Sequence, residues 1–180
     1  MNTEYKVIDN FLDPKDFSDV QQIVMGEEME WSYQEVLNHE QDGDKYIYDS
    51  YFAHLVFRNE HFGRHAGITP PHDQVIRTRW LPAFIYIVEK LNANALLRIK
   101  CNLYPWSQQL KEHSAHEDYP FEHTGALFSL NTCDGYTKLS DGTKVSSVAN
   151  RMLLFNAGLK HCSTTTTNAK ARFNINFNYF

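Results

Sequence analysis

The second half of the sequence, from Ala95 to the C-terminus, limits most tightly how this chain can fold. Between residues 96 and 104, apolar residues alternate with Arg98, Lys100 and Asn102, a period of two that is typical of a β-strand. Further short segments of strand-like composition follow at close spacing, at residues 126–130, 136–139, 143–148, 152–155, 162–166 and 172–179. Turn signals such as Asp141-Gly142 separate them. Many short strands in series predict a sandwich or barrel rather than a parallel α/β sheet.

The first half of the chain mixes helix and strand signals. We expect a strand at residues 5–8, a helix at 14–25, short strands and loops at 26–72, and a second helix, broken near Pro82, at about 74–91. Asp13 is a plausible N-cap for the first helix, and Pro14 suits its first position. The predicted fold class is α+β, with two N-terminal helices packed against a C-terminal jelly roll.

Length and composition bound the protein class. A chain of 180 residues predicts one domain, with a helical and variable part at residues 1–94 and the jelly-roll core at 95–180. The net charge of −5, without a basic block, makes a large nucleic-acid-binding face improbable. Three cysteines without a CxxC pair argue against a disulfide scaffold and a thiolate zinc site, and favour a reducing compartment. With no signal peptide and no apolar run long enough to cross a bilayer, a cytoplasmic protein is expected.

Three residues are candidates for a metal site. His116 and Asp118 form a His-x-Asp pair, and residues two apart on an extended segment project to the same face. His161, just after the turn signal Asn156-Ala157-Gly158, is a distant third ligand. Two imidazoles and one carboxylate on one face of an octahedron leave other positions open, as non-haem iron(II) oxygen chemistry requires. The chain has nine histidines, so the pair alone is a weak signal. The signal for a metal site is strengthened by the order along the chain: the His-x-Asp pair comes first, then several strands, then His161, and then an arginine in the last strand.

That arginine, Arg172, lies in the last predicted strand among apolar residues. Burying a guanidinium without a partner is costly. A dicarboxylate ligand would supply the planar, bidentate partner that arginine favours. Without the three candidate metal ligands, a surface cross-strand ion pair would be the preferred explanation of Arg172.

Residues from about 97 to 180 resemble the double-stranded β-helix (jelly-roll) core of the Fe(II)/2-oxoglutarate-dependent oxygenase superfamily, and most closely its prolyl 4-hydroxylase-like members. The resemblance rests on short motifs in a fixed order: Asn102-Leu103-Tyr104-Pro105, His116-Glu117-Asp118, Leu127-Phe128-Ser129-Leu130-Asn131, Asn150-Arg151-Met152-Leu153-Leu154-Phe155, His161 and Arg172-Phe173-Asn174.

The resemblance implies roles for individual residues. It implies His116, Asp118 and His161 as the iron ligands, and Arg172 as the ion-pair partner of the distal carboxylate of 2-oxoglutarate. Tyr104 matches a tyrosine whose hydroxyl also contacts that carboxylate in prolyl hydroxylases. The chain departs from the family at two positions. Ser129 lies near the position where the subgroup commonly has a second tyrosine. Asn174 stands two residues after Arg172, where many relatives have Ser or Thr. Both are candidate co-substrate contacts.

The implied activity is that of a dioxygenase using Fe(II), 2-oxoglutarate and O₂. It would couple decarboxylation of 2-oxoglutarate to succinate with oxidation of a small-molecule or peptide substrate, as a hydroxylase. Hydroxylation of prolyl peptides follows only from the subgroup likeness. A cupin-like metal protein using His113 or His123 as an extra ligand is one alternative, and a non-enzymatic jelly-roll binding module is another. Oligomeric state has no signature in this sequence.

Overall fold

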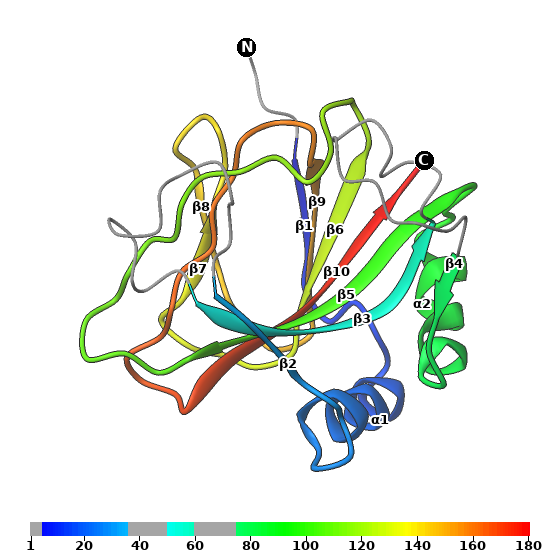
Figure 1. The fold of residues 1–180 in the computed structure, drawn as a ribbon, viewed down its shortest axis with the longest axis horizontal. Helices are drawn as coiled ribbons and strands as arrows, with labels where there is room; N and C mark the ends of the chain where they lie inside the picture. Colours follow the sequence, from blue (N-terminus) through cyan, green and yellow to red (C-terminus); the bar gives the residue numbers. More distant parts are fainter. Residues whose placement is uncertain (1–4, 36–49, 60–74) are drawn as a thin grey trace.

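The computed structural model describes residues 5–35, 50–59 and 75–180, and one large antiparallel sheet organises them (Figure 1). Its strands lie in the order β1-β9-β6-β10-β5-β3-β2, and β4 also pairs with β3. They are β1 (Lys6–Ile8), β2 (Ser32–Gln34), β3 (Tyr51–Asn59), β4 (Val75–Arg77), β5 (Leu96–Pro105), β6 (Thr124–Ser129), β9 (Arg151–Asn156) and β10 (Ala171–Tyr179). A second sheet pairs β7 (Tyr136–Lys138) with β8 (Lys144–Ser146). The mostly antiparallel sheets, with few helices, are consistent with the predicted jelly roll.

The first helix begins and ends where the sequence predicts, as α1 (Pro14–Met25). Asp13 precedes it with extended backbone, although its side chain makes no capping hydrogen bond. Val20 and Val24, four residues apart, are buried on one face of the helix. They belong to the main core, which also contains Phe128 of the large sheet.

The second predicted helix, at about 74–91, is wrong in its first half. The segment forms strand β4, then the 3-10 helix Leu81–Phe84, and only then α2 (Ile85–Lys90). Two of the three residues in β4 are β-branched, and the strand completes hydrogen bonds at the end of β3. Pro82 has no backbone N–H and is tolerated in the first turn of the short helix, where that donor would be unsatisfied anyway. None of the helices in the described ranges is both long and apolar enough to span a bilayer.

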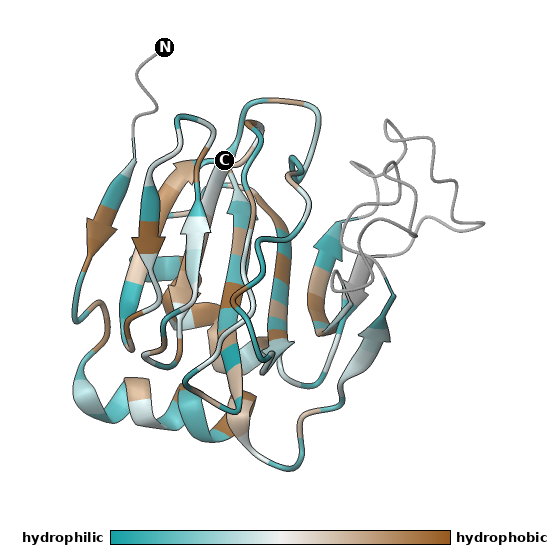
Figure 2. Cartoon of the chain, turned by 90° about the vertical axis from the view of Figure 1, so that its left-hand side faces the viewer, coloured by the Kyte–Doolittle hydropathy of each residue, from teal (hydrophilic) through white to brown (hydrophobic). Residues whose placement is uncertain are grey.

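The alternation of residues in β5 and β10 gives the large sheet two different faces. Ile99 and Cys101 of β5 and Ile175 and Phe177 of β10 lie in the main core with the helices. The residues between them are polar and pair across the two strands as four rungs: Arg172 with Tyr104, Asn174 with Asn102, Asn176 with Lys100, and Asn178 with Arg98. We call these eight residues the inner rows. Figure 2 shows the alternation as teal and brown bands along the strands.

The inner rows face the small sheet, because the guanidinium of Arg172 donates hydrogen bonds to the Tyr136 carbonyl and the Thr137 hydroxyl of β7. Asn102, Asn174 and Asn178 are each at most 2% exposed, so the sheet carries a buried polar surface. Buried polar side chains require partners. The inner rows therefore mark the interior between the two sheets as the place to look for a site.

The strand predicted at residues 162–166 does not form as a continuous element. Instead, single bridges join residues 161–166 to Lys138 and to the segment at residues 106–116. These bridges are His116–His161, Lys138–Cys162, Glu112–Thr164 and Trp106–Thr166. His116 and Asp118 likewise lie in an irregular segment and not in a strand. The segments that carry the candidate metal ligands are thus held by single bridges over the inner rows.

Candidate metal centre

His116, Asp118 and His161 come together in space. The backbone N–H of His116 donates to the carbonyl of His161 at 2.9 Å, and the reverse bond is 2.8 Å long, so one reciprocal bridge places the two histidines side by side. One ligand atom from each of the three residues lies within 4.8 Å of the others. No other group of three or more His, Cys, Asp or Glu side chains within the described part of the chain has this arrangement.

The hydrogen bonds of both histidines favour the same tautomer. Nδ1 of His161 lies 3.0 Å from the Leu159 carbonyl, and Nδ1 of His116 lies 3.4 Å from the Ser114 carbonyl. A carbonyl accepts only from a protonated nitrogen, which leaves Nε2 of each ring with a free lone pair. Burial, reinforced by the neighbouring His161, lowers the pKa of His116 to about 4. The imidazole of His116 is therefore neutral at physiological pH, the form that binds metal.

The carboxylate of Asp118 is held by three donors from the inner rows. Arg98 Nη2 donates to Oδ1 at 2.5 Å, and the amides of Asn176 and Asn178 each donate to Oδ2 at 2.9 Å. Burial would raise the pKa of Asp118, but the charge of Arg98 and the two histidines hold it well below its usual range. An ionised carboxylate has about four acceptor positions, so one position remains beside the histidines. The carboxylate is thus charged and fixed in orientation.

A narrow cavity opens next to the two histidines. It is lined by inner-row residues, by Leu127, by residues of β7 and β9, and by the histidines themselves: Lys100, Asn102, Tyr104, His116, Leu127, Thr137, Phe155, His161, Ser163, Asn174 and Asn176. The ring of Phe155 packs edge-on against His161, with ring centroids 4.9 Å apart. Two candidate ligands from separate parts of the sequence, His116 and His161, therefore share one enclosed space with the inner rows.

Arg172 lies at the end of the inner rows next to Tyr104 and is only 1% exposed. Its Nη1 donates to the carbonyls of Tyr136 and Thr164, and its Nη2 donates to the Thr137 hydroxyl. None of the described carboxylates lies within ion-pair distance, so the charge of this guanidinium is uncompensated. The surface ion pair that would have made Arg172 unremarkable is excluded by its burial. An anionic ligand would supply the missing partner.

Unsatisfied polar atoms gather around the same cavity. Buried side-chain atoms without a hydrogen-bond partner include Asn102 Oδ1, Asn174 Nδ2 and Asn176 Oδ1, all on residues that line it. Arg172 Nε is a fourth such atom. Native proteins rarely leave buried polar groups unpaired unless a ligand or water completes them. Two of these atoms, Arg172 Nε and Asn174 Nδ2, are donors that an anionic group would satisfy, whereas the two amide oxygens require a donor such as a water molecule or a ligand hydroxyl.

The other predicted site residues lie as follows. Tyr104 and Asn174 line the cavity. Ser129 sits opposite Asn174 on β6, one position beyond the lining residue Leu127 on the same face of the sheet. His113 and His123, the extra ligands of the cupin-like alternative, are not in the metal-binding group. Nδ1 of His113 lies 2.8 Å from Ser163 Oγ, and His123 Nε2 accepts from Asn178.

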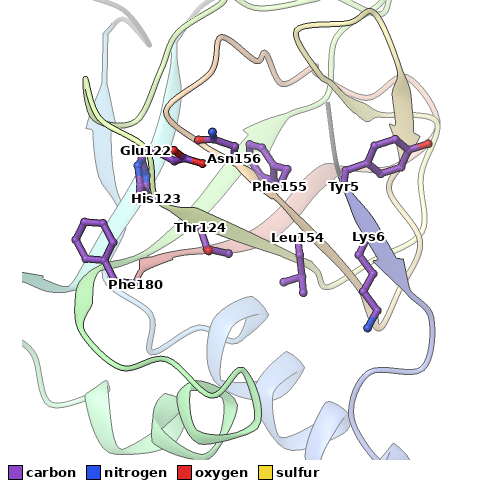
Figure 3. A pocket seen from close by; sticks show the side chains of 9 residues that line it. All are labelled: Tyr5, Lys6, Glu122, His123, Thr124, Leu154, Phe155, Asn156 and Phe180. Carbon is purple, nitrogen blue, oxygen red and sulfur yellow. The ribbon is translucent and has the colours of Figure 1, made fainter. Parts of the chain in front are cut away.

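A wider hollow lies elsewhere, between the ends of β1, β6 and β9 and the C-terminal residue (Figure 3). It is lined by Tyr5, Lys6, Glu122, His123, Thr124, Leu154, Phe155, Asn156 and Phe180. None of His116, Asp118 and His161 is among them, so size alone does not identify the site. Phe155 lines both this hollow and the metal-site cavity.

Folding stability should fall in mild acid because of His113. Burial, followed by the nearby charge of Arg172, lowers the pKa of His113 to about 3. The unfolded chain binds a proton at this residue once the pH falls below about 6.5, whereas the folded chain does not. Stability is therefore lost as the pH falls, by about 2 kcal/mol between pH 7 and pH 5. Urea unfolding at both pH values should show this loss reduced by a similar amount in His113→Gln. An unchanged loss in that variant would contradict the assignment.

No protein-family model and no curated protein sequence matches the chain. Solved structures do. A prolyl hydroxylase from Trichoplax adhaerens, in complex with a peptide fragment of the hypoxia inducible factor oxygen degradation domain, matches with a TM-score of 0.65 and 16% identity, over 99% of this chain and 84% of that one. A 2OG-Fe(II) oxygenase family oxidoreductase from Burkholderia pseudomallei matches with a TM-score of 0.66 and 8% identity, over 97% and 84%.

HygX from Streptomyces hygroscopicus, solved with nickel and 2-oxoglutarate bound, matches with a TM-score of 0.58 and 11% identity, over 98% of this chain and 82% of that one. At such low identities these likenesses show the fold. The chain has the fold of these Fe(II)/2-oxoglutarate oxygenases along nearly its whole length.

Proposed function

We propose that this chain is a single-domain, non-haem Fe(II)- and 2-oxoglutarate-dependent dioxygenase, acting as a hydroxylase on a small molecule or a peptide. One observation carries the proposal: the buried, uncompensated guanidinium of Arg172 contacts Thr137 and Tyr104, which line the same cavity as His116 and His161. A metal site alone would not require a buried cation, and a binding module with incidental histidines would not require the triad. Together they match the needs of a chelating co-substrate with a distal carboxylate.

The roles of the chain's residues follow from their positions. His116, Asp118 and His161 would hold Fe(II) through two imidazole nitrogens and one carboxylate oxygen. When bound, the iron would supply the activation of O₂ for substrate oxidation coupled to conversion of 2-oxoglutarate to succinate. Arg172 would bind the distal carboxylate, with Tyr104 beside it; the guanidinium carbon lies 5.7 Å from the centroid of that ring. Leu127 and Phe155 form an apolar part of the cavity wall, which would exclude water from the site.

The cupin-like alternative is less well supported. It needs a third or fourth histidine at the metal, and the side chains of His113 and His123 are engaged with Ser163 and Asn178. Substrate identity is open between small molecules and peptides. The Trichoplax adhaerens structure holds a peptide, and the net charge of −5 without a basic block disfavours nucleic acid as the substrate of this chain.

Thermal unfolding with Mn(II) and 2-oxoglutarate, added singly and together, tests the proposal. A ligand at about 100 times its dissociation constant stabilises a fold by roughly 2.7 kcal/mol. We expect Mn(II) to stabilise the protein and 2-oxoglutarate to add a second increment. Stabilisation by metal without any response to 2-oxoglutarate would favour the cupin-like alternative. No response to either ligand would leave the non-enzymatic binding module.

Gly135→Ala should weaken 2-oxoglutarate binding by displacing Arg172, although the substitution replaces no residue that would bind the ligand. A Cβ at Gly135 would lie 2.7 Å from Cδ of Arg172 and 2.9 Å from the carbonyl oxygen of Thr165. The carbonyl is part of the backbone, so the arginine must shift, and overpacking of this kind is rarely accommodated without displacement. Isothermal titration should show a loss of about tenfold in 2-oxoglutarate affinity, since small misplacements of a charged pair are costly. Mn(II) affinity serves as the internal control and should not change.

A further inference from the structure

Lys100 is the one inner-row cation that the proposed function leaves without a role. It lies on β5 between Arg98 and Asn102 and pairs across the strands with Asn176, whose amide holds Asp118. Its side chain lines the same cavity as His116 and His161. The lysine therefore lies towards the metal end of the inner rows, whereas Arg172 lies at their other end, beside the lining residue Tyr104.

The ammonium of Lys100 has little to bind within the described part of the chain. It donates one long hydrogen bond, of 3.3 Å, to the hydroxyl of Tyr51, and it lies 5.4 Å from the centroid of that ring. No described carboxylate lies within ion-pair distance of it, and Asp118 already accepts from Arg98, Asn176 and Asn178. An ammonium carries three donors, so two of them have no acceptor among the residues that the structure describes.

The charge of this lysine survives its surroundings. Burial, and then the charge of Arg98, lower the pKa of Lys100 to about 8. At neutral pH, Lys100 is therefore protonated in most molecules. A cation that is partly removed from water without an anionic partner gains most from an anionic ligand.

The inner rows set the spacing between the two cations. Lys100 and Tyr104 are four residues apart on β5, and Arg172 is paired with Tyr104, so the cationic positions are two rung spacings apart with one rung between them. Two rung spacings correspond to roughly 13 Å along the strand, and both side chains reach inward from their ends. The rung between them, Asn102 with Asn174, carries no charge. The cavity thus lies between two positive charges, Lys100 in its lining and Arg172 behind the lining residues Tyr104 and Thr137.

We propose that Lys100 binds the keto-acid carboxylate of 2-oxoglutarate, so that the chain holds both carboxylates of this co-substrate with its own cations and binds it in the absence of metal. This inference rests on the proposed function, because it takes the cavity as the 2-oxoglutarate site. A charge-assisted hydrogen bond in a partly dry cavity contributes enough to change affinity by about tenfold to a hundredfold.

Two five-carbon acids isolate the contribution of the second carboxylate. Glutarate has a carboxylate at each end but no keto group with which to chelate a metal, whereas pentanoate has one carboxylate. We would titrate both, and 2-oxoglutarate, into metal-free protein by calorimetry, in the wild type, in Lys100→Met and in Lys100→Arg. Glutarate should bind the wild type at least about tenfold more tightly than pentanoate. Lys100→Met should abolish that preference, and Lys100→Arg should retain most of it.

The same experiment separates failure of this inference from failure of the proposed function. Equal affinities of glutarate and pentanoate for the metal-free wild type overturn the inference, and this comparison stands even if Lys100→Met does not fold. If 2-oxoglutarate then binds in the presence of Mn(II), the oxygenase proposal survives. If it binds under neither condition, both fail. If Lys100→Met retains the glutarate preference but weakens binding of an acidic substrate, Lys100 serves the substrate and the inference is wrong.

Discussion

Replacing Arg172 with methionine is expected to weaken 2-oxoglutarate binding by about two to three orders of magnitude while divalent metal still binds. Truncating one partner of a buried, hydrogen-bonded charge pair costs 2–5 kcal/mol or more, which corresponds to about thirtyfold to several thousandfold in affinity. The guanidinium does not touch the triad, because its hydrogen bonds go to Tyr136, Thr137 and Thr164. Methionine fills a similar volume without a charge, so the fold should not lose stability from the substitution.

Calorimetric titration of 2-oxoglutarate in the presence of Mn(II), and of Mn(II) alone, measures both parts of this prediction. Arg151→Met is the matched control, because Arg151 pairs with Asp9 at the surface and lies outside the cavity. The control should bind 2-oxoglutarate as the wild type does. If Arg172→Met lost metal and co-substrate binding together, misfolding would explain the result. If it retained 2-oxoglutarate affinity, Arg172 would have no role in the co-substrate site.

Replacing Asp118 with asparagine should have two separable effects. Loss of a charged ligand should reduce Mn(II) affinity by more than about 100-fold, beyond the effect of removing an outer-shell partner. Breaking a buried ion pair by removing one partner also costs about 3–5 kcal/mol of folding stability. Here the side chains of Arg98 and Asp118 are 15% and 2% exposed, so the arginine would remain largely buried without its counter-ion.

The double variant Arg98→Met/Asp118→Asn distinguishes the two effects. Urea unfolding should show most of the lost stability restored, because no unpaired charge remains, whereas metal titration should show no recovery. If the double variant were as unstable as Asp118→Asn, the ion pair would not be the cause of the instability. If Asp118→Asn bound Mn(II) as the wild type does, the assignment of Asp118 as a ligand would be wrong.

The parts of the fold that the sequence predicts well are those with strong local periodicity. The alternation in β5 and β10 gives both strands nearly to their ends, and Pro14 marks the start of α1. The helix prediction for residues 74–91 is wrong at β4, because this strand is only three residues long and is stabilised by pairing with β3, which is distant in the sequence. The strand prediction for residues 162–166 is wrong for the opposite reason. Their composition is typical of a strand, but they pair with other segments only through single bridges and not along a continuous strand edge.

The candidate site was only partly accessible from sequence. His116, Asp118, His161 and Arg172 could be proposed because motif order and charge in an apolar strand are visible in one dimension. The partners of Asp118 could not, since Arg98, Asn176 and Asn178 converge on it only through the register of β5 against β10. The period of two shows that these residues face inward. It does not show which side chain across the sheet each one meets.

The two faces of β5 and β10 also have an evolutionary consequence. Ile99 and Cys101 pack into the core, while on the opposite face Arg98 bonds to Asp118 and Lys100 lines the cavity. Selection on stability and selection on chemistry therefore act on alternate residues of the same strand, with little interference between them. Such a strand can exchange one inward side chain for another, and so acquire a different specificity, while its outward neighbours keep the scaffold intact. Descendants of one ancestral sheet could thus diverge widely in reaction and in sequence and still fold alike.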